Sequence, residues 1–283
     1  FLAFLTIAIF ITCTSTAKQR PEGGWLWKIS GNGLSHPSYL FGTYHGTYDI
    51  LYQYTDSIPE LHQASNACSQ FAGESETTSK PTPAQVGAAI KLPKDTTYAD
   101  LLNKEDFHFL DSIVRQSLKS PLNKVYIKPN FLALILGEIE KGKKLVDTGY
   151  SQSRIDSMKS QVMDIALEKK AKEKGLTIVG LEGIFDAFVS EKSNLKKEAD
   201  ELISDLREDD EISPLSFVNT LSDVYRTQNM KSLIDFEVKV DSIFRTSPKL
   251  TEIGKRIRED LLKRRNLNWM NKIPELMKAQ PTF

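Results

Sequence analysis

The sequence predicts a mixed α/β (α+β) fold, in which a small central β-sheet carries the functional motifs and helices flank it, with a large all-helical portion. Two observations predict this class. Segments rich in aromatic and β-branched residues lie at about 25–45 and 176–183, and long segments between and after them repeat apolar residues at helical spacing. A helix that ends at Gly175 and leads directly into a β-branched segment is typical of the crossover unit of an α/β core.

The first two strands are predicted to form a hairpin. Residues 25–30, WLWKIS, alternate large apolar residues with others, as a half-buried strand does. The following segment, GNGLSHPS, is made of residues that favour turns. Residues 38–45, SYLFGTYH, indicate the second strand, which leads to His45.

Helices are predicted for most of the remaining chain, with mainly helical regions at about 98–175 and 184–278. A short helix over 58–67 has Ser57 as its N-cap and Pro59 in its first turn. Residues 75–97, rich in Ser, Thr, Pro and Lys, are expected to form a loop. Longer helices are expected over 104–118, 129–141 and 156–174, before a strand in LTIVGLEG that ends near Glu182.

The N-terminal segment indicates an exported protein. The first 12 residues are almost wholly apolar and suit the core of a signal peptide over 1–17, with a few residues expected to precede Phe1. Lipid modification of Cys13 is a second interpretation, which Thr12 fits less well. We therefore expect a secreted or periplasmic protein with one domain over 18–283 and no transmembrane helix in the mature chain. Lys+Arg and Asp+Glu both number 37, and this balance gives no electrostatic indication of nucleic-acid binding.

Two residues that follow predicted strands are candidates for a functional site. His45 comes just after a buried strand, where α/β folds place their ligands. Taken alone, it is either a structural histidine or a metal ligand. Glu182 ends a buried strand between Gly180 and Gly183, and a charge at such a place needs a partner. Capping of the next helix is its alternative role.

Further candidates are Glu74, near the end of a weaker strand, and Asp164, on the inner side of a helix. Arg265 either pairs with a core carboxylate or belongs to a surface basic cluster, Lys263–Arg265. One histidine with several carboxylates suits a divalent metal such as Mn, Co or Zn. Such a metal would polarise a carbonyl and activate water, with a carboxylate as general base.

The motifs as a set resemble the TraB/PrgY/GumN family, to which the Tiki metalloproteases are related. The resemblance covers about residues 25–283. The segments that carry it are Trp27-Lys28 with Gly42-Thr43-Tyr44-His45, the helix with Asp164, the strand that ends Gly180-Leu181-Glu182, and the helix with Arg265-Asn266.

This resemblance implies metal-dependent hydrolysis of a peptide or protein substrate. It implies that His45 and Glu74 are metal ligands, that Glu182 is a ligand or the general base, and that Arg265 gives electrostatic support to an oxyanion. The family pattern continues to a strand and a second Gly-x-x-His, so we expect this chain to be truncated just after Phe283, at the start of that strand. A truncated chain is expected to expose a sheet edge.

Two other functions remain open from the sequence. The first is a non-catalytic extracytoplasmic module that binds a peptide or a haem-like ligand, with the apolar helix segment 130–139 lining a cleft or simply packing in the core. The second is an inactive fragment.

Overall fold

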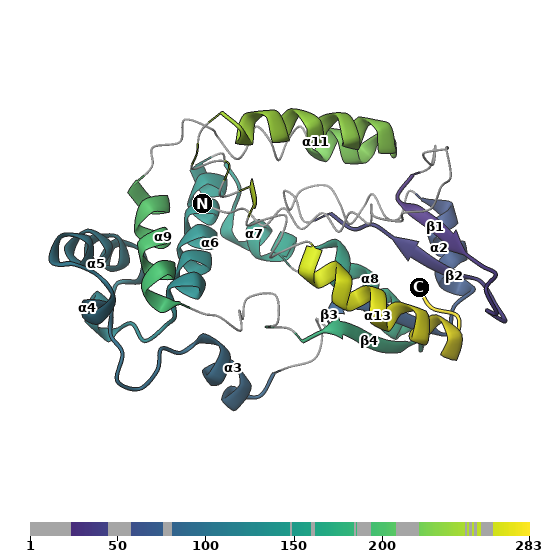
Figure 1. Cartoon of the computed structure of the whole chain (residues 1–283), viewed down its shortest axis with the longest axis horizontal. Helices are drawn as coiled ribbons and strands as arrows, with labels where there is room; N and C mark the ends of the chain where they lie inside the picture. The colour runs from purple at the N-terminus through teal and green to yellow at the C-terminus, as the bar shows by residue number, and fades with distance from the viewer. Residues whose placement is uncertain are drawn as a thin grey trace. The chain divides into compact units, whose positions relative to one another are not determined.

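The structure is a computed structural model, and it describes residues 24–44, 58–75, 81–147, 149–159, 162–183, 185, 194–207, 221–246, 248, 251, 254–255 and 263–283. The described part is mostly helical, with two two-stranded sheets, which confirms the predicted mixed α/β class (Figure 1).

The chain divides into two compact units. One comprises residues 4–79, 157–184 and 215–283, and the other comprises 1–3, 80–156 and 185–214.

The first unit contains the predicted hairpin. Strand β1 (Leu26–Ile29) pairs antiparallel with β2 (Ser38–Phe41), with Leu26 opposite Phe41. The turn between them contains Gly31 and Gly33, with φ of 88° and 82°. These left-handed angles cost a glycine little, so the GNG segment fixes the turn as the sequence predicts.

A parallel strand pair forms the second sheet of this unit. Strand β3 (Gln70–Ser75) pairs with β4 (Thr177–Glu182), with Gln70 opposite Thr177. Helix α8 (Met163–Glu173) precedes β4 and packs against both strands. Gly175, with φ of 76°, lies between this helix and the strand. The predicted unit of helix, glycine and strand is thus confirmed.

Residues 281–283 connect the two sheets. The N–H of Tyr39 in β2 donates to the carbonyl oxygen of Thr282 (2.8 Å). On the other side, Thr282 bridges Gln70 of β3 in parallel, and the N–H of Ala72 donates to the oxygen of Phe283 (2.8 Å). These residues therefore act as a short strand between β2 and β3.

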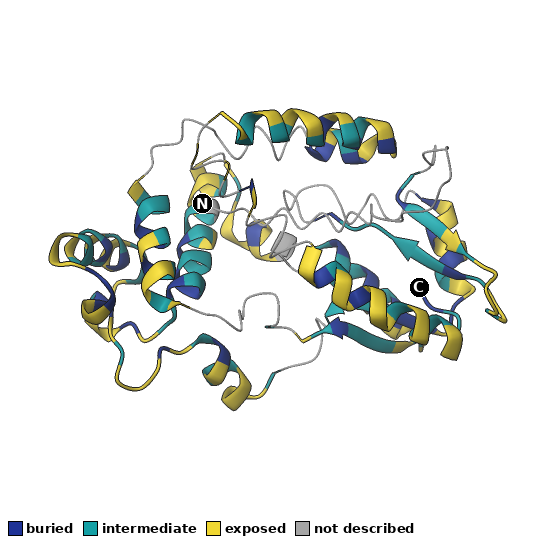
Figure 2. Ribbon diagram, in the orientation of Figure 1, coloured by how far each residue is buried: buried dark blue, intermediate teal, exposed yellow. Residues whose placement is uncertain are grey.

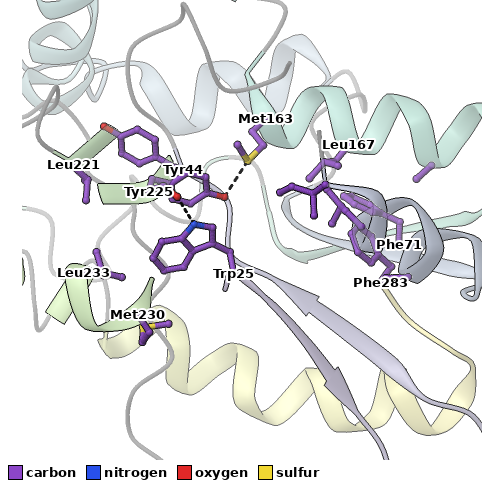
Figure 3. Close-up of a cluster of buried hydrophobic side chains, with 14 of the residues drawn as sticks. Trp25, Tyr44, Phe71, Met163, Leu167, Leu221, Tyr225, Met230, Leu233 and Phe283 are labelled. Carbon is purple, nitrogen blue, oxygen red and sulfur yellow. Dashed lines mark hydrogen bonds between the residues drawn. The ribbon is translucent and has the colours of Figure 1, made fainter. Parts of the chain in front are cut away.

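The helices of this unit also include α2 (Pro59–Asn66), α11 (Met230–Phe244) and α13 (Arg264–Ala279), and residues 221–226 are helical. Exposed residues cover much of α13, whereas Arg265 and Trp269 are buried (Figure 2). An aromatic and aliphatic core brings together Trp25, Tyr44, Phe71, Met163, Tyr225 and Phe283, among others (Figure 3). The residues of this core come from positions between Trp25 and Phe283, and they pack helices of this unit against its strands.

The other unit is helical and has its own core. Its elements are α3 (Pro83–Ile90), α4 (Tyr98–Leu101), α5 (Lys104–Leu118), the 3-10 helix η1 (Leu122–Lys124), α6 (Pro129–Asp147) and α9 (Leu195–Arg207); α7 (Gln152–Lys159) begins in it. The core includes the fully buried Leu110, Val114, Leu122 and Leu132. Helix α5 has the predicted bounds, with Asn103 as its N-cap.

Several details differ from the sequence-based expectations, among them the ends of α6, which runs to Asp147, and of β2, which stops at Phe41. The expected loop over 75–97 contains α3, which begins with a capping box between Thr82 and Gln85. The expected helix over 156–174 is replaced by parts of α7 and α8, and Val162 is the N-cap position of α8. The N-cap position of α2 is Ile58 rather than Ser57, because the helix begins at Pro59.

Among the described residues, no helix combines the length and the apolar character that crossing a membrane requires. The predicted signal segment lies outside the described residues.

Candidate functional site

The two candidate glutamates lie at the same end of the parallel sheet. Glu74 belongs to β3 and Glu182 is the last residue of β4, opposite Ser75. Neighbouring parallel strands have their carboxyl ends at the same edge of the sheet, so the side chains of Glu74 and Glu182 lie close together. Their side chains are 22% and 11% exposed. A charge so little exposed requires a partner.

Arg265 is that partner for both glutamates. Its Nη2 donates to Oε2 of Glu74 (2.7 Å), and its Nε lies 3.0 and 3.1 Å from the two carboxylate oxygens of Glu182. Nη2 also pairs with Oε1 of Glu182. Arg265 is therefore the partner of core carboxylates and not part of a surface cluster, in contrast to Lys263 and Arg264, which are exposed.

The environment keeps Arg265 charged. Burial by itself would lower the pKa of Arg265, but the hydrogen bonds and charges of Glu182 and Glu74 outweigh burial and raise the pKa above its ordinary value. The guanidinium carbon also lies 4.8 Å from the centre of the Trp269 ring, a cation–π arrangement.

A cavity of about 100 Å³ lies beside the ion-pair cluster. Glu74 and Asp164 are the acidic residues among those that line it, and the rest are mainly apolar or aromatic. The aromatic residues that line it are Trp27, Tyr39, Phe41, Phe71, Trp269 and Phe283. Ligand sites are usually mostly apolar with a few convergent polar groups, and they measure roughly 300–1,000 Å³. This cavity has that composition but the size of a pocket for a single side chain.

His45, the first predicted metal ligand, lies outside the described residues. The residue directly before it, Tyr44, is buried and makes close contacts. Tyr44 is 2% exposed and its ring stacks on Tyr225 at 5.4 Å, while Ser222 donates to its hydroxyl. Burial raises the pKa of Tyr44, although the bond from Ser222 lowers it.

Gly42, three residues before His45, is held by the same aromatic group. Its N–H donates to the oxygen of Trp25 (2.8 Å), and the Tyr225 hydroxyl donates to its carbonyl oxygen. The indole N–H of Trp25 in turn donates to the carbonyl oxygen of Tyr225 (2.6 Å), and the two rings stack at 5.0 Å (Figure 3). The segment that leads to His45 therefore starts from a rigid position.

The described residues alone do not make a metal centre. Over the ranges that the structure describes, no group of three or more His, Cys, Asp and Glu side chains could hold a metal ion. Glu74 and Glu182 instead converge on Arg265. A metal site at this edge would need a further ligand, for which the sequence offers His45.

Some residues of the site carried a signal in the sequence and others did not. Asp164 lines the cavity, in agreement with its predicted inner position. Tyr225 and Lys272, which donates to the carbonyl oxygen of Leu181, were not expected. Both lie in the long helical region 184–278, where helical periodicity shows burial but not the partner of a side chain.

A comparison with known protein families matches residues 25–283 to the TraB/PrgY/gumN family. No curated protein and no solved structure matches the chain. The matched range contains every described residue of the ion-pair cluster and of the cavity.

Proposed function

Since this chain belongs to the TraB/PrgY/gumN family, we propose that it is a hydrolase of peptide bonds with Glu74, Glu182 and Arg265 at its active site. The convergence of these three side chains beside an aromatic-lined cavity is the observation that carries the proposal. The apolar segment 1–12 supports action outside the cytoplasm, as a secreted or periplasmic protein.

The roles follow from the positions of the three side chains. Glu74 lines the cavity, so we assign to it the general base that takes a proton from the attacking water. Glu182 binds both Nε and Nη2 of Arg265 and positions the guanidinium. Within the described ranges Nη1 of Arg265 donates to no residue, and we assign this group to the oxygen on which negative charge develops.

A divalent metal is part of this proposal through its predicted ligands. Of the predicted ligands, His45 and Glu182 would hold Mn, Co or Zn, and Glu74 stays free as the general base. When bound, the metal would supply a Lewis acid for the water and the carbonyl. Because the described residues do not by themselves fit a metal centre, the steps above are assigned to the protein's own side chains.

Arg265 pairs with both glutamates, and this observation favours a second candidate function, peptide binding without catalysis. If the Glu74–Arg265–Glu182 cluster is structural, the cavity belongs to a non-catalytic module that binds a peptide. An ion pair of this kind fixes one arrangement of the surrounding elements without any chemistry.

A quenched-fluorescence peptide library separates the two functions. The purified protein, supplied in turn with Mn, Co or Zn, should cleave part of the library, and Glu74→Gln should lower the rate at least 100-fold. Glu275→Gln, an exposed position on the same helix as Arg265, is the matched control and should leave the rate unchanged. Metal content measured by mass spectrometry should fall in His45→Ala. Saturable peptide binding without cleavage would establish the binding module instead.

A further inference from the structure

The helical unit contains a second hollow, which we call the α3 groove. Its volume is about 290 Å³, and it is lined by residues 86–87 and 90–91 on one wall and residues 124–127 on the other. Backbone bonds hold the two walls together, because the N–H of Leu92 donates to the oxygen of Tyr126 (3.0 Å) and that of Lys128 to the oxygen of Ile90 (2.8 Å). All of these residues belong to one compact unit, so the groove is formed within it.

The lining of the α3 groove is mainly apolar. Its apolar side chains are those of Val86, Ile90, Val125, Tyr126 and Ile127. Tyr126 is 59% exposed, so a ligand in the groove would cover apolar surface that the fold leaves in water. An apolar cavity of about 150 Å³ holds the six carbons of benzene, and by this measure the groove suits a ligand of about twelve non-hydrogen atoms.

Gly87 keeps this groove open. It lies inside α3, where glycine is less favourable than alanine, and its backbone is not left-handed. A Cβ placed on Gly87 would meet, among the described residues, the side chain of Lys91 at an ordinary contact distance of 3.9 Å. Neither backbone conformation nor close packing therefore requires a glycine here, whereas a larger side chain would occupy part of the groove.

The two segments that form the groove carry positive charge without acidic residues. Residues 81–94 and 116–131 contain no Asp or Glu, and their lysines are Lys91, Lys94, Lys119, Lys124 and Lys128. Within the described ranges, none of these five forms an ion pair. Lys91 and Lys124 line the groove, one on each wall. Lysine can lay its apolar stem along such a surface and keep its ammonium group in water, so the groove offers cations beside an apolar lining.

The size of the groove favours a small ligand over a protein. A stable protein interface takes roughly 20–30 residues from each partner, whereas the lining names eight described residues. We propose that the α3 groove binds a small amphiphilic anion, an aliphatic carboxylate of about ten carbons, with its chain on the apolar lining and its carboxylate at Lys91 and Lys124. This ligand site shares no residue with the Glu74–Arg265–Glu182 cluster, so it does not rest on the proposed function.

The test titrates the 283-residue chain with decanoate, below its micellar concentration, in a calorimeter. Decanoate should bind saturably at one site. Hexanoate keeps the head group but has four fewer methylenes, and it should bind about 10-fold more weakly. Decyltrimethylammonium keeps the chain but reverses the charge, and it should show no saturable binding over the same range of concentration.

Two variants place the site in the groove. Gly87→Leu fills it while favouring the helix, and it should weaken decanoate binding by about 10-fold with an unchanged circular dichroism spectrum. Lys91→Gln with Lys124→Gln should weaken it by about 5-fold. The matched control is Lys104→Gln with Lys143→Gln, two exposed lysines of the same unit that do not line the groove, and it should bind as the unchanged chain does.

Each result decides for or against the inference, independently of any cleavage. Unchanged affinity in a folded Gly87→Leu, or equal affinity for decanoate and decyltrimethylammonium, would overturn it. If Gly87→Leu does not fold, the lysine pairs decide, because equal affinities in the groove pair and the control pair would also overturn the site. Saturable binding of the acetylated peptide Leu-Glu-Leu-Glu without binding of decanoate would assign the groove to a peptide and refute the proposed ligand.

Discussion

Arg265 and Glu74 lie 191 positions apart in the chain, yet Nη2 of the arginine is 2.7 Å from Oε2 of the glutamate. The same guanidinium binds Glu182, so helix α13 is fixed to the ends of both β3 and β4. The same three side chains therefore contribute to the stability of the fold and form the candidate active site. Substitutions in them can be tested for their effect on stability and on activity.

Removal of the charge of Arg265 should lower the stability of the fold. Arg265→Met removes the cation that contacts both Glu74 and Glu182, whose side chains are 22% and 11% exposed, and we expect it to lower the free energy of unfolding by about 3 kcal/mol. Arg264→Met, at the exposed neighbouring position, should change it by less than about 0.5 kcal/mol. Urea unfolding followed by circular dichroism measures both. Equal losses would show that the cluster is not a stabilising element.

The two glutamates should differ in their contribution. Glu182 pairs with both Nε and Nη2 of Arg265 and is 11% exposed, whereas Glu74 has one bond to this arginine and is 22% exposed. We expect Glu182→Gln to lower the free energy of unfolding by about 2 kcal/mol and Glu74→Gln by about 1 kcal/mol. Chemical denaturation of the two variants gives the order, and the reverse order would contradict this account.

Two buried tryptophans provide a matched comparison. The indole N–H of Trp25 donates to Tyr225, whereas that of Trp269 is buried with no acceptor in the part of the chain that the structure describes. Both changes to phenylalanine remove the same volume, but Trp25→Phe also removes a hydrogen bond to the carbonyl oxygen of Tyr225, which then keeps the longer one from the N–H of Gln228 (3.2 Å). We therefore expect Trp25→Phe to lose about 1 kcal/mol more stability than Trp269→Phe. Thermal unfolding of the two variants should show this difference, and an equal loss would count against the assigned hydrogen bond.

The thiol of Cys68 predicts a pH dependence. Burial raises its pKa from 9.0 to about 11. A folded-state pKa above the unfolded value gives a contribution to stability that is present below pH 9 and is lost as the pH rises toward 11. In a Cys13→Ser background, the stability advantage of Cys68 over Cys68→Ala should fall by about 2 kcal/mol across this interval. A difference that stays constant from pH 8 to pH 11 would show that the thiol is not buried.

Much of the local structure could be predicted because its signals are local. The hairpin follows from its alternation and glycine turn, and α5 has the predicted bounds because Asn103 caps a strongly periodic segment. Helix α3 was missed because its alanines and glycine lie among Pro, Ser and Thr, although Thr82 and Gln85 form a capping box.

The site could be predicted in part. The glutamates at strand ends and the arginine beside Trp269 are anomalies in a single sequence, since buried charges need partners. Their pairing with one another depends on how α13 packs on the sheet, which periodicity does not specify. Tyr225, which holds Gly42, gave no signal because an aromatic residue in a helical segment is usually ordinary core.

The short ladder formed by residues 281–283 also bears on how the chain folds. It joins β2 to β3 with residues that are synthesised more than 200 positions after either strand. The unit that contains the sheets is assembled from three separate stretches of sequence, so its contact order is high and its folding is expected to be slow. While the ribosome completes the chain, the edges of β2 and β3 are open to pairing with other chains, so aggregation during synthesis is the hazard that this topology carries.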